Sequence, residues 1–190
     1  MHVYRMQQLI KERAKDTVVN VAQRNSLYQT IARLERDALV RVQRTSREEN
    51  RPERAVYQIT DSGRTTLDVW LADMLSTPAR EFPEFPAALA FMALLPAARV
   101  KELLRTRKAE LERHLRAART ATARAAEAGL PRLFLLEDEY KEAIIVAEID
   151  WIGRVVADLE LGKLAWSQAW IRSVARRMER SQSESPKRKG

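Results

Sequence analysis

The chain has 190 residues, 45% of them apolar and 32% charged, with a formal net charge of +8 at neutral pH. This composition is typical of a soluble globular chain with one sizeable domain or two small ones. The sequence has no apolar run of the roughly 18 residues that cross a bilayer and no signal-peptide core, so we expect no membrane partner. The absence of cysteine excludes disulfides and thiolate sites, and it is compatible with the cytoplasmic location that we expect.

The distribution of charge says more than its total. Residues 1–75 carry a net charge of +3, residues 76–175 carry +1, and residues 176–190 carry +4. We expect residues 181–190 to form a disordered basic tail, which could also add unspecific affinity for phosphate. Basicity alone is a weak indication of nucleic acid, so the pattern within the first segment has to carry that interpretation.

Two helices are expected within the first forty residues. Apolar side chains at helical spacing predict the first helix over residues 3–14, followed by a connector over residues 15–21. Ser26 has the chemistry of an N-cap for the second helix, and Gln29 three residues later would complete a capping box. One stripe of this second helix is apolar and consists of Leu27, Ile31, Leu34 and Ala38. The opposite stripe is polar or cationic and consists of Asn25, Gln29, Arg33 and Arg36.

A two-stranded hairpin is expected next. Val40 and Val42 alternate with polar neighbours, and after a charged loop Ala55, Tyr57 and Ile59 alternate with Val56 and Gln58. This period of two is typical of strands with one buried face. A small helix followed by a basic hairpin is the order in which winged helix-turn-helix domains present their DNA-binding elements.

Thr60 is expected to cap a further helix whose core stripe consists of Leu67, Trp70, Leu71 and Met74. The prolines at 78, 83 and 86 then predict a break. We therefore expect a winged-helix domain over residues 1–76, a Pro-rich linker over 77–86 and an all-α domain over 87–180. The expected fold class is mainly α, with the two-stranded wing as its β structure.

Three helices are expected in the second domain, over residues 97–128, 133–161 and about 165–180. The first has Leu104, Leu111 and Ala118 at spacings of seven. The second has apolar residues over more than one narrow stripe, which a two-helix hairpin does not cover by itself. A second subunit would cover the remaining apolar face, so we predict a homodimer built on the C-terminal helices.

Several strings, taken in order, resemble one family. Residues 1–4, MHVY, resemble the MHGY that opens the second helix of PadR-family transcriptional regulators. Residues 26–28, SLY, with LE at 34–35, resemble that family's recognition helix, and RPERAVYQITDSG at 51–63 resembles its wing and exit. Residues 147–152, AEIDWI, are similar to the long C-terminal helix of members with a large helical domain. The resemblance covers most of residues 1–162 and implies a DNA-binding regulator, with repression as its expected action.

The sequence departs from the family pattern in two places. Asn50 stands where the family wing often has glycine, and asparagine tolerates positive φ, so we expect the turn to be kept. The chain also begins at the family's second helix, so the first helix of the winged-helix core is missing, and we expect a start codon assigned too late. An incomplete core would expose the backs of Leu9, Ile31 and Leu34.

The polar stripe of the second helix is the expected base-reading surface. Asn25 and Gln29 have the amide groups that pair with adenine, and Arg33 has the guanidinium that pairs with guanine. A polar helix face is often only solvated, so the wing and the family resemblance are what favour DNA contact.

Phosphate contacts are expected around this surface. The hydroxyls of Ser26 and Tyr28 suit phosphate, and the resemblance implies a phosphate contact from Tyr4. Ser26 could instead act only as a cap, and Tyr28 could pack beside the core. The wing arginines are expected along the DNA backbone or the minor groove, although three wing glutamates offer them other partners; they are Arg47, Arg51 and Arg54.

Enzyme chemistry is poorly supported. Five glycines leave no Gly-rich phosphate loop, and the two histidines, His2 and His114, cannot form a metal cluster, so we expect no catalytic residue, cofactor or metal site. Trp151 and Trp166 favour dimer core, and the alternative is an aromatic-lined pocket for a small-molecule effector.

The sequence therefore predicts a sequence-specific DNA-binding transcriptional regulator that binds a pseudo-palindromic double-stranded operator as a homodimer. The alternative from another class is a helical protein–protein interaction module whose degenerate winged helix does not read DNA.

Overall fold

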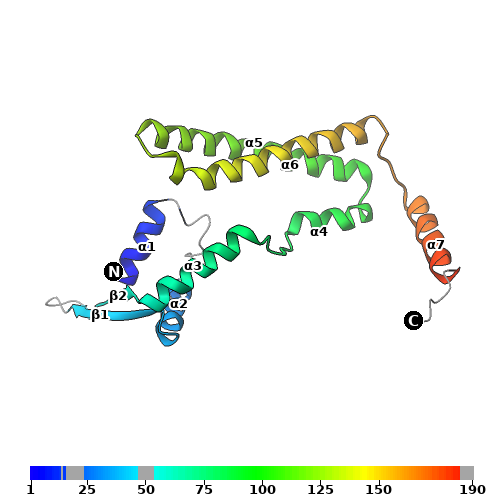
Figure 1. Ribbon diagram of the computed structural model, residues 1–190. Helices are drawn as coiled ribbons and strands as arrows, with labels where there is room; N and C mark the ends of the chain where they lie inside the picture. The colour runs from blue at the N-terminus through cyan, green and yellow to red at the C-terminus, as the bar shows by residue number, and fades with distance from the viewer. Residues whose placement is uncertain (14, 16–23, 47–53, 185–190) are drawn as a thin grey trace. The chain divides into compact units, whose positions relative to one another are not determined.

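The computed structural model of the protein describes residues 1–13, 15, 24–46 and 54–184 (Figure 1). At positions 24, 25, 45, 46, 54 and 180–184 it describes the backbone but not the side chain. The chain divides into two compact units, Met1–Glu81 and Phe82–Gly190.

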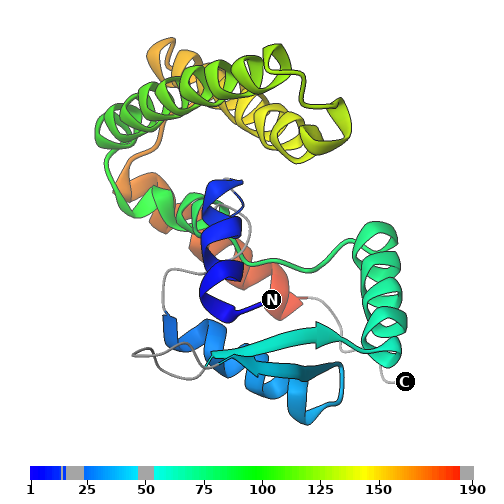
Figure 2. The same cartoon turned by 90° about the vertical axis from the view of Figure 1, so that its left-hand side faces the viewer.

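Unit 1 is a small winged helix. Its elements in chain order are α1 (Val3–Glu12), α2 (Arg24–Arg36), β1 (Val40–Ser46), β2 (Arg54–Ile59) and α3 (Asp61–Ser76). The two strands pair antiparallel, as Figure 2 shows, with Val40 opposite Ile59. The predicted order of helix, hairpin and helix is confirmed.

The wing contains a β-bulge that the sequence pattern did not predict. Val42 pairs with Tyr57 and Arg44 pairs with Val56, so Gln43 is the extra residue on β1. A bulge of this kind reverses the alternation of side chains beyond it. On the partner strand β2, whose register is continuous, Val56 was predicted to share the polar face with Gln58 but is buried.

Thr60 ends the wing and begins α3, as predicted. Its side-chain oxygen accepts a hydrogen bond from the backbone N–H of Gly63 at 2.9 Å, and its hydroxyl donates to the carbonyl of Ala38 at 2.8 Å. Ala38 has a φ of 55°, so it lies in a left-handed turn after α2 and is not part of the apolar helix stripe predicted for it. The cap therefore fastens the start of α3 to the turn that precedes β1.

The core of unit 1 is thin. Among the described residues of this unit, the buried apolar side chains are Val3, Ile31 and Val56, from α1, α2 and β2. Ile31 is buried, so the expectation that an incomplete core would expose it is wrong.

The predicted core stripe of α3 is wrong for the chain as described. Its four residues are between 42% and 67% exposed; they are Leu67, Trp70, Leu71 and Met74. Helical periodicity correctly places them on one helix, but periodicity does not say what covers a stripe. Within the described part of unit 1, this apolar surface faces solvent.

Unit 2 is all-α. Its elements are α4 (Glu84–Phe91), η2 (Met92–Leu94), α5 (Ala97–Glu127), η3 (Arg132–Phe134), α6 (Leu136–Glu160) and α7 (Gln168–Glu184). The long helices α5 and α6 lie side by side as a hairpin (Figures 1 and 2). Val100 and Leu104 of α5 pack with Ile152 of α6, so the predicted seven-residue spacing marks the inner face of α5.

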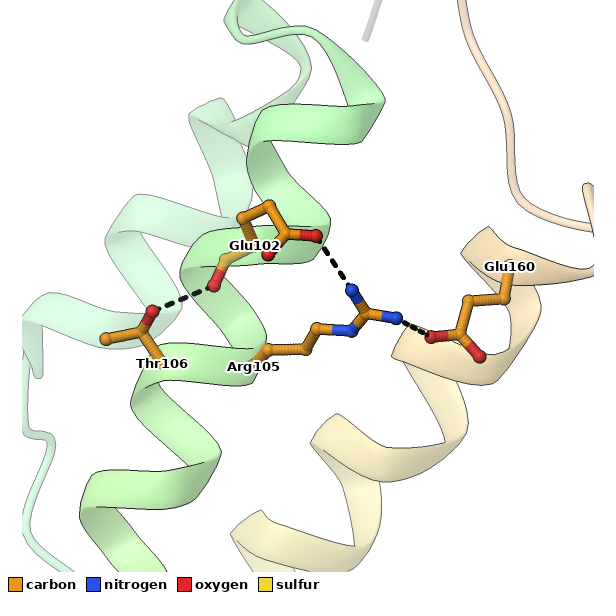
Figure 3. Close-up of polar contacts among 4 residues, drawn as sticks. All are labelled: Glu102, Arg105, Thr106 and Glu160. Atoms are coloured by element: carbon orange, nitrogen blue, oxygen red, sulfur yellow. Dashed lines mark hydrogen bonds and ion pairs between the residues drawn. The ribbon is translucent and has the colours of Figure 1, made fainter.

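The open end of this hairpin, where α5 begins and α6 ends, is held by polar contacts. Arg105 of α5 donates to Glu102 at 2.8 Å and also to Glu160 on α6 (Figure 3). Trp166, which follows α6, donates its indole N–H to the carbonyl of Leu95 at 2.9 Å. The segment after α6 is therefore fastened to the start of α5.

Two predicted boundaries differ from the structure. The segment 77–86 was predicted to be a linker, but α4 begins at Glu84 and contains Pro86 in its first turn. Proline is tolerated there because the first N–H groups of a helix have no partner within the helix. The predicted disordered tail over 181–190 also starts too early, because α7 continues to Glu184; residues 185–190 lie outside the described part of the chain.

Among the described residues, no helix is both long and apolar enough to cross a bilayer. The same residues contain no group of three or more carboxylate or histidine side chains arranged to hold a metal ion.

Candidate nucleic-acid interface

Helix α2 already includes Ser26 and the two residues before it, whereas the sequence predicts that Ser26 caps the helix. It starts at Arg24, so Ser26 lies inside the first turn and is not the N-cap. The carbonyl of Ser26 accepts a hydrogen bond from the hydroxyl of Thr30 at 2.9 Å, a contact made within a helix. The predicted capping box between Ser26 and Gln29 is therefore wrong, because both residues are already helical.

The polar stripe of α2 is exposed where it is described. Gln29 and Arg33 are one helical turn apart and both face solvent. Arg33 lies in the last turn of the helix, away from the helix start. Its long side chain would allow it to reach a partner from there. The side chain of Asn25, predicted to extend this stripe, lies outside the described residues.

Two tyrosines predicted as phosphate contacts come together. Tyr4 from α1 and Tyr28 from α2, with Gln7, line one small concave site. Both tyrosines are about half exposed, 52% and 56%, so Tyr28 does not pack into the core. The Tyr4 hydroxyl accepts from the side-chain amide of Gln8 at 3.1 Å, and an accepting hydroxyl still carries a hydrogen to donate.

Sequence reasoning missed Gln7, and it could not have predicted how close the tyrosines lie. The repeat of Tyr4, Gln7 and Gln8 along α1 was the available signal, since positions three and four apart share a helix face.

The position of α1 is fixed by the wing. The amino group of Met1 donates to the carbonyl of Tyr57 at 2.6 Å, and the N–H of Tyr57 donates to the carbonyl of Met1 at 3.0 Å. The Nδ1 atom of His2 lies 3.1 Å from the carbonyl of Ala55. Through these contacts the strand β2 sets the start of α1, and with it the place of Tyr4.

The wing carries two exposed cations that sequence reasoning did not single out. Arg41 pairs with Gln58 and Arg44 pairs with Val56 across the hairpin. Because Val56 and Gln58 are two residues apart, Arg41 and Arg44 lie on one face of the sheet. The bulge at Gln43 produces this arrangement, since residues three apart in a regular strand point to opposite faces.

The predicted wing contacts cannot be compared with the structure. Arg47 and Arg51 lie outside the described residues. Arg54 begins β2, opposite Ser46, but its side chain is not among the described ones.

The pKa of Tyr57, on strand β2, is raised. Burial raises the pKa of this phenol above its ordinary value near 10, and the negative charge of Glu35 and the neighbouring Tyr28 phenol raise it further. A phenol is protonated at neutral pH even at its ordinary pKa, so this shift affects the protein only in alkaline solution.

Comparison with known proteins agrees with this geometry. Residues 1–69 match the Transcriptional regulator PadR-like family, a stretch that runs from α1 through the wing into α3. This part of the chain is PadR-like. No curated protein matches the sequence.

The PadR-like fold extends beyond the matched residues. The structure of Bacillus subtilis PadR in complex with operator DNA is similar with a TM-score of 0.68 at 17% identity, over 84% of this chain and 91% of that one. The PadR-like transcriptional regulator BC1756 from Bacillus cereus is similar with a TM-score of 0.50 at 16% identity, over 72% and 76% of the two chains. At these identities the likeness concerns the fold, a winged helix followed by a helical domain.

The two tryptophans predicted to line an effector pocket make contacts inside unit 2. Trp151 meets Phe85 edge to face, with ring centroids 6.1 Å apart, and Trp166 bonds to Leu95 at the open end of the hairpin. Arg107 lies 3.8 Å from the centre of the Phe85 ring and donates to Glu148 at 2.6 Å. These contacts favour packing of α4 onto the hairpin, and the effector pocket stays a prediction.

Proposed function

We propose that this protein is a sequence-specific DNA-binding transcriptional regulator that acts as a homodimer and represses its target. The observation that carries the proposal is the PadR-like match over residues 1–69, which spans the helix α2 that exposes Gln29 and Arg33. The fold shared with a PadR solved on operator DNA supports it.

The described side chains suggest which residues contact bases and which contact phosphates. The amide of Gln29 and the guanidinium of Arg33 have the donors and acceptors that read base edges in a major groove. Tyr4 and Tyr28, from two helices that meet at one concave site, suit a phosphate beside that groove. Arg41 and Arg44 on one face of the wing would add charge along the backbone. Arg47, Arg51 and Arg54 are proposed to continue this contact.

A homodimer fits the surface of unit 2. The hairpin leaves large apolar side chains exposed along α5 and α6, among them Leu103 and Ile144. A two-fold dimer presents two copies of α2 and so selects a pseudo-palindromic operator. An aromatic small molecule that releases the operator, and a cytoplasmic location, complete the proposal.

The test is a gel-shift titration against the DNA upstream of the protein's own coding sequence. Arg33→Ala and Gln29→Ala should each weaken binding to the specific site by about 1–3 kcal/mol, with little change on unrelated DNA. Arg41→Ala should weaken binding to both DNAs alike and flatten the salt dependence, because phosphate contacts carry no sequence information.

Arg99→Ala is the matched control. It removes one exposed cation from α5 in unit 2, where the proposal places no DNA contact. Arg99→Ala should bind both DNAs like the original protein; if the three contact variants do so as well, the proposed contacts are wrong.

The alternative, a protein–protein interaction module, is favoured by one observation: the apolar stripe of α3, including Trp70, is exposed. A protein that shows equal, weak retardation of every DNA tested, in the same titration, would support this alternative instead.

A further inference from the structure

The start of α6 presents an apolar ridge to solvent. Leu136, Tyr140 and Ile144 are spaced four residues apart and all are exposed, Tyr140 by 69%. Residues i, i+4 and i+8 form one ridge of a helix surface. Phe134, in the short turn before α6, extends the same apolar end of the hairpin.

Helix α7 has a ridge of the same spacing. Trp170, Val174 and Met178 are also four residues apart, with Trp170 and Met178 exposed and Val174 half-buried. Ridges of equal four-residue spacing are those that interdigitate in the commonest helix–helix packing of globular proteins.

The two segments carry opposite net charge, although acids at the start of α6 also pair within the chain, Glu139 with Arg132 and Glu142 with Arg119 of α5. Residues 132–142, around the start of α6, contain four acidic and two basic side chains, a net charge of −2. Residues 168–179 of α7 contain three arginines and one glutamate, a net charge of +2. Apolar ridges of equal spacing with opposite flanking charge are complementary in both shape and field.

The α7 ridge does not reach the α6 ridge of its own chain. Trp166 is bonded to Leu95 at the open end of the hairpin, and the N–H of Trp170 is bonded to the Ser167 hydroxyl, so α7 starts at that end. At 1.5 Å per residue, Ile144 lies about 24 Å from the end of α6, whereas Met178 is only about 15 Å along α7. Within one chain, the α7 ridge therefore does not cover the α6 ridge.

We propose that α7 of one copy packs on the start of α6 of a second copy, and that the exchange is reciprocal. A two-fold axis that sets the two hairpins antiparallel brings the open end of each beside the closed end of the other. The arrangement rests on the homodimer in the proposed function. It assigns α7 as the helix that packs on the partner subunit. The dimer is then held at both ends of the hairpins as well as along them.

The absence of cysteine from the chain makes a disulfide test possible. Full-length Tyr140→Cys is mixed with full-length Val174→Cys, and the mixture is oxidised mildly. The proposal predicts a disulfide-linked dimer that contains one chain of each kind. The matched control pairs Tyr140→Cys with Arg172→Cys, which places the thiol on the opposite face of α7, and should give at least about fivefold less linked dimer, since a disulfide needs Cβ atoms within about 4.5 Å.

Three results would overturn the proposal. One is no linked dimer from the mixture, or as much from the Arg172→Cys control. Another is linkage of Tyr140→Cys to itself, which would place the two α6 starts against each other. The third is a monomer with an internal disulfide in the Tyr140→Cys/Val174→Cys double variant, which would fold α7 onto its own hairpin.

Sedimentation and a gel shift on the same samples separate this proposal from the proposed function. A protein that sediments as a dimer and retards its operator, but forms no linked dimer, keeps the proposed function and rejects the α7 exchange. A protein that sediments as a monomer rejects the homodimer and the exchange together, and its operator binding then decides whether it is a regulator. Circular dichroism of each variant confirms that a negative result does not come from unfolding.

Discussion

The two units bury their apolar residues to different degrees. In unit 2 the hairpin encloses Val100, Leu104 and Ile152, the last with no exposed surface, and the core lies between two long neighbouring helices. In unit 1 the core is a few residues from three elements, and α3 leaves most of its apolar side chains exposed. In a long helical hairpin, the two helices bury each other's apolar faces. A winged helix has short elements, so each of its helices is needed to bury the core.

The largest expected effect tests this difference directly. Ile152→Ala should lower the free energy of unfolding by about 2–5 kcal/mol, because it removes buried methyl groups and leaves a cavity. Val69→Ala on α3 should change it by less than about 0.5 kcal/mol, since Val69 is 61% exposed and little is lost from its surroundings. Denaturant unfolding followed by circular dichroism measures both. A large loss at Val69 would show that something covers α3 in solution.

Glycine to alanine should have opposite signs in the two units. The Cβ of Gly63→Ala would collide with the carbonyl oxygen of Leu39 and lie 2.8 Å from a side-chain carbon of Ile59, so we expect a loss of about 1–3 kcal/mol. Gly153→Ala in α6 meets only the end of the Lys108 side chain, at 3.8 Å. Alanine there should stabilise the helix by about 0.5–1 kcal/mol. Thermal unfolding of the two variants compares them, and equal effects would contradict the close approach at Gly63.

Loss of the cap on α3 should have a smaller effect. Thr60→Ala removes the acceptor for the Gly63 N–H and the donor to Ala38, with an expected cost of about 0.5–2 kcal/mol. Thr60→Ser keeps the hydroxyl and is the control. If the serine variant is as unstable as the alanine variant, the hydroxyl is not what holds the start of α3.

The smallest effect concerns pH. Because burial raises the pKa of Tyr57 above 10, the folded protein favours the protonated phenol more than the unfolded chain does. The stability from this group is fully present below pH 10 and is lost as pH rises through the raised pKa. Tyr57→Phe cannot ionise, so its unfolding free energy should decline less as pH rises above about 10. Parallel declines for the two proteins would contradict this role.

Prediction from sequence succeeded where the signal was periodic. The apolar spacing around Leu104 fixed the inner face of α5, and the alternation from Val40 to Ile59 fixed the hairpin. It failed at single residues that depend on local geometry. Ser26 has the chemistry of a cap but lies inside α2, and Pro86 lies inside a helix rather than ending one. A cap and a first-turn position are only one or two residues apart along the chain. A periodic pattern of apolar residues does not distinguish between them.

The candidate interface was partly predictable for the same reason. The polar stripe with Gln29 and Arg33 follows from helical spacing alone, as does the choice of Tyr4 and Tyr28 from their chemistry and family resemblance. The meeting of those tyrosines at one site, and the shared face of Arg41 and Arg44, depended on contacts between elements distant in sequence and on a one-residue bulge. A bulge has no period, so it leaves little trace in a single sequence.

By itself, the sequence determined the order of elements, the PadR-like character of residues 1–69 and the inner face of the helical hairpin, because these depend on local spacing and short strings. The tertiary structure alone decided which apolar stripes are covered. The same periodic pattern produced a buried face on α5 and exposed faces on α3 and α7, since burial depends on the neighbour that a helix meets and not on the helix itself.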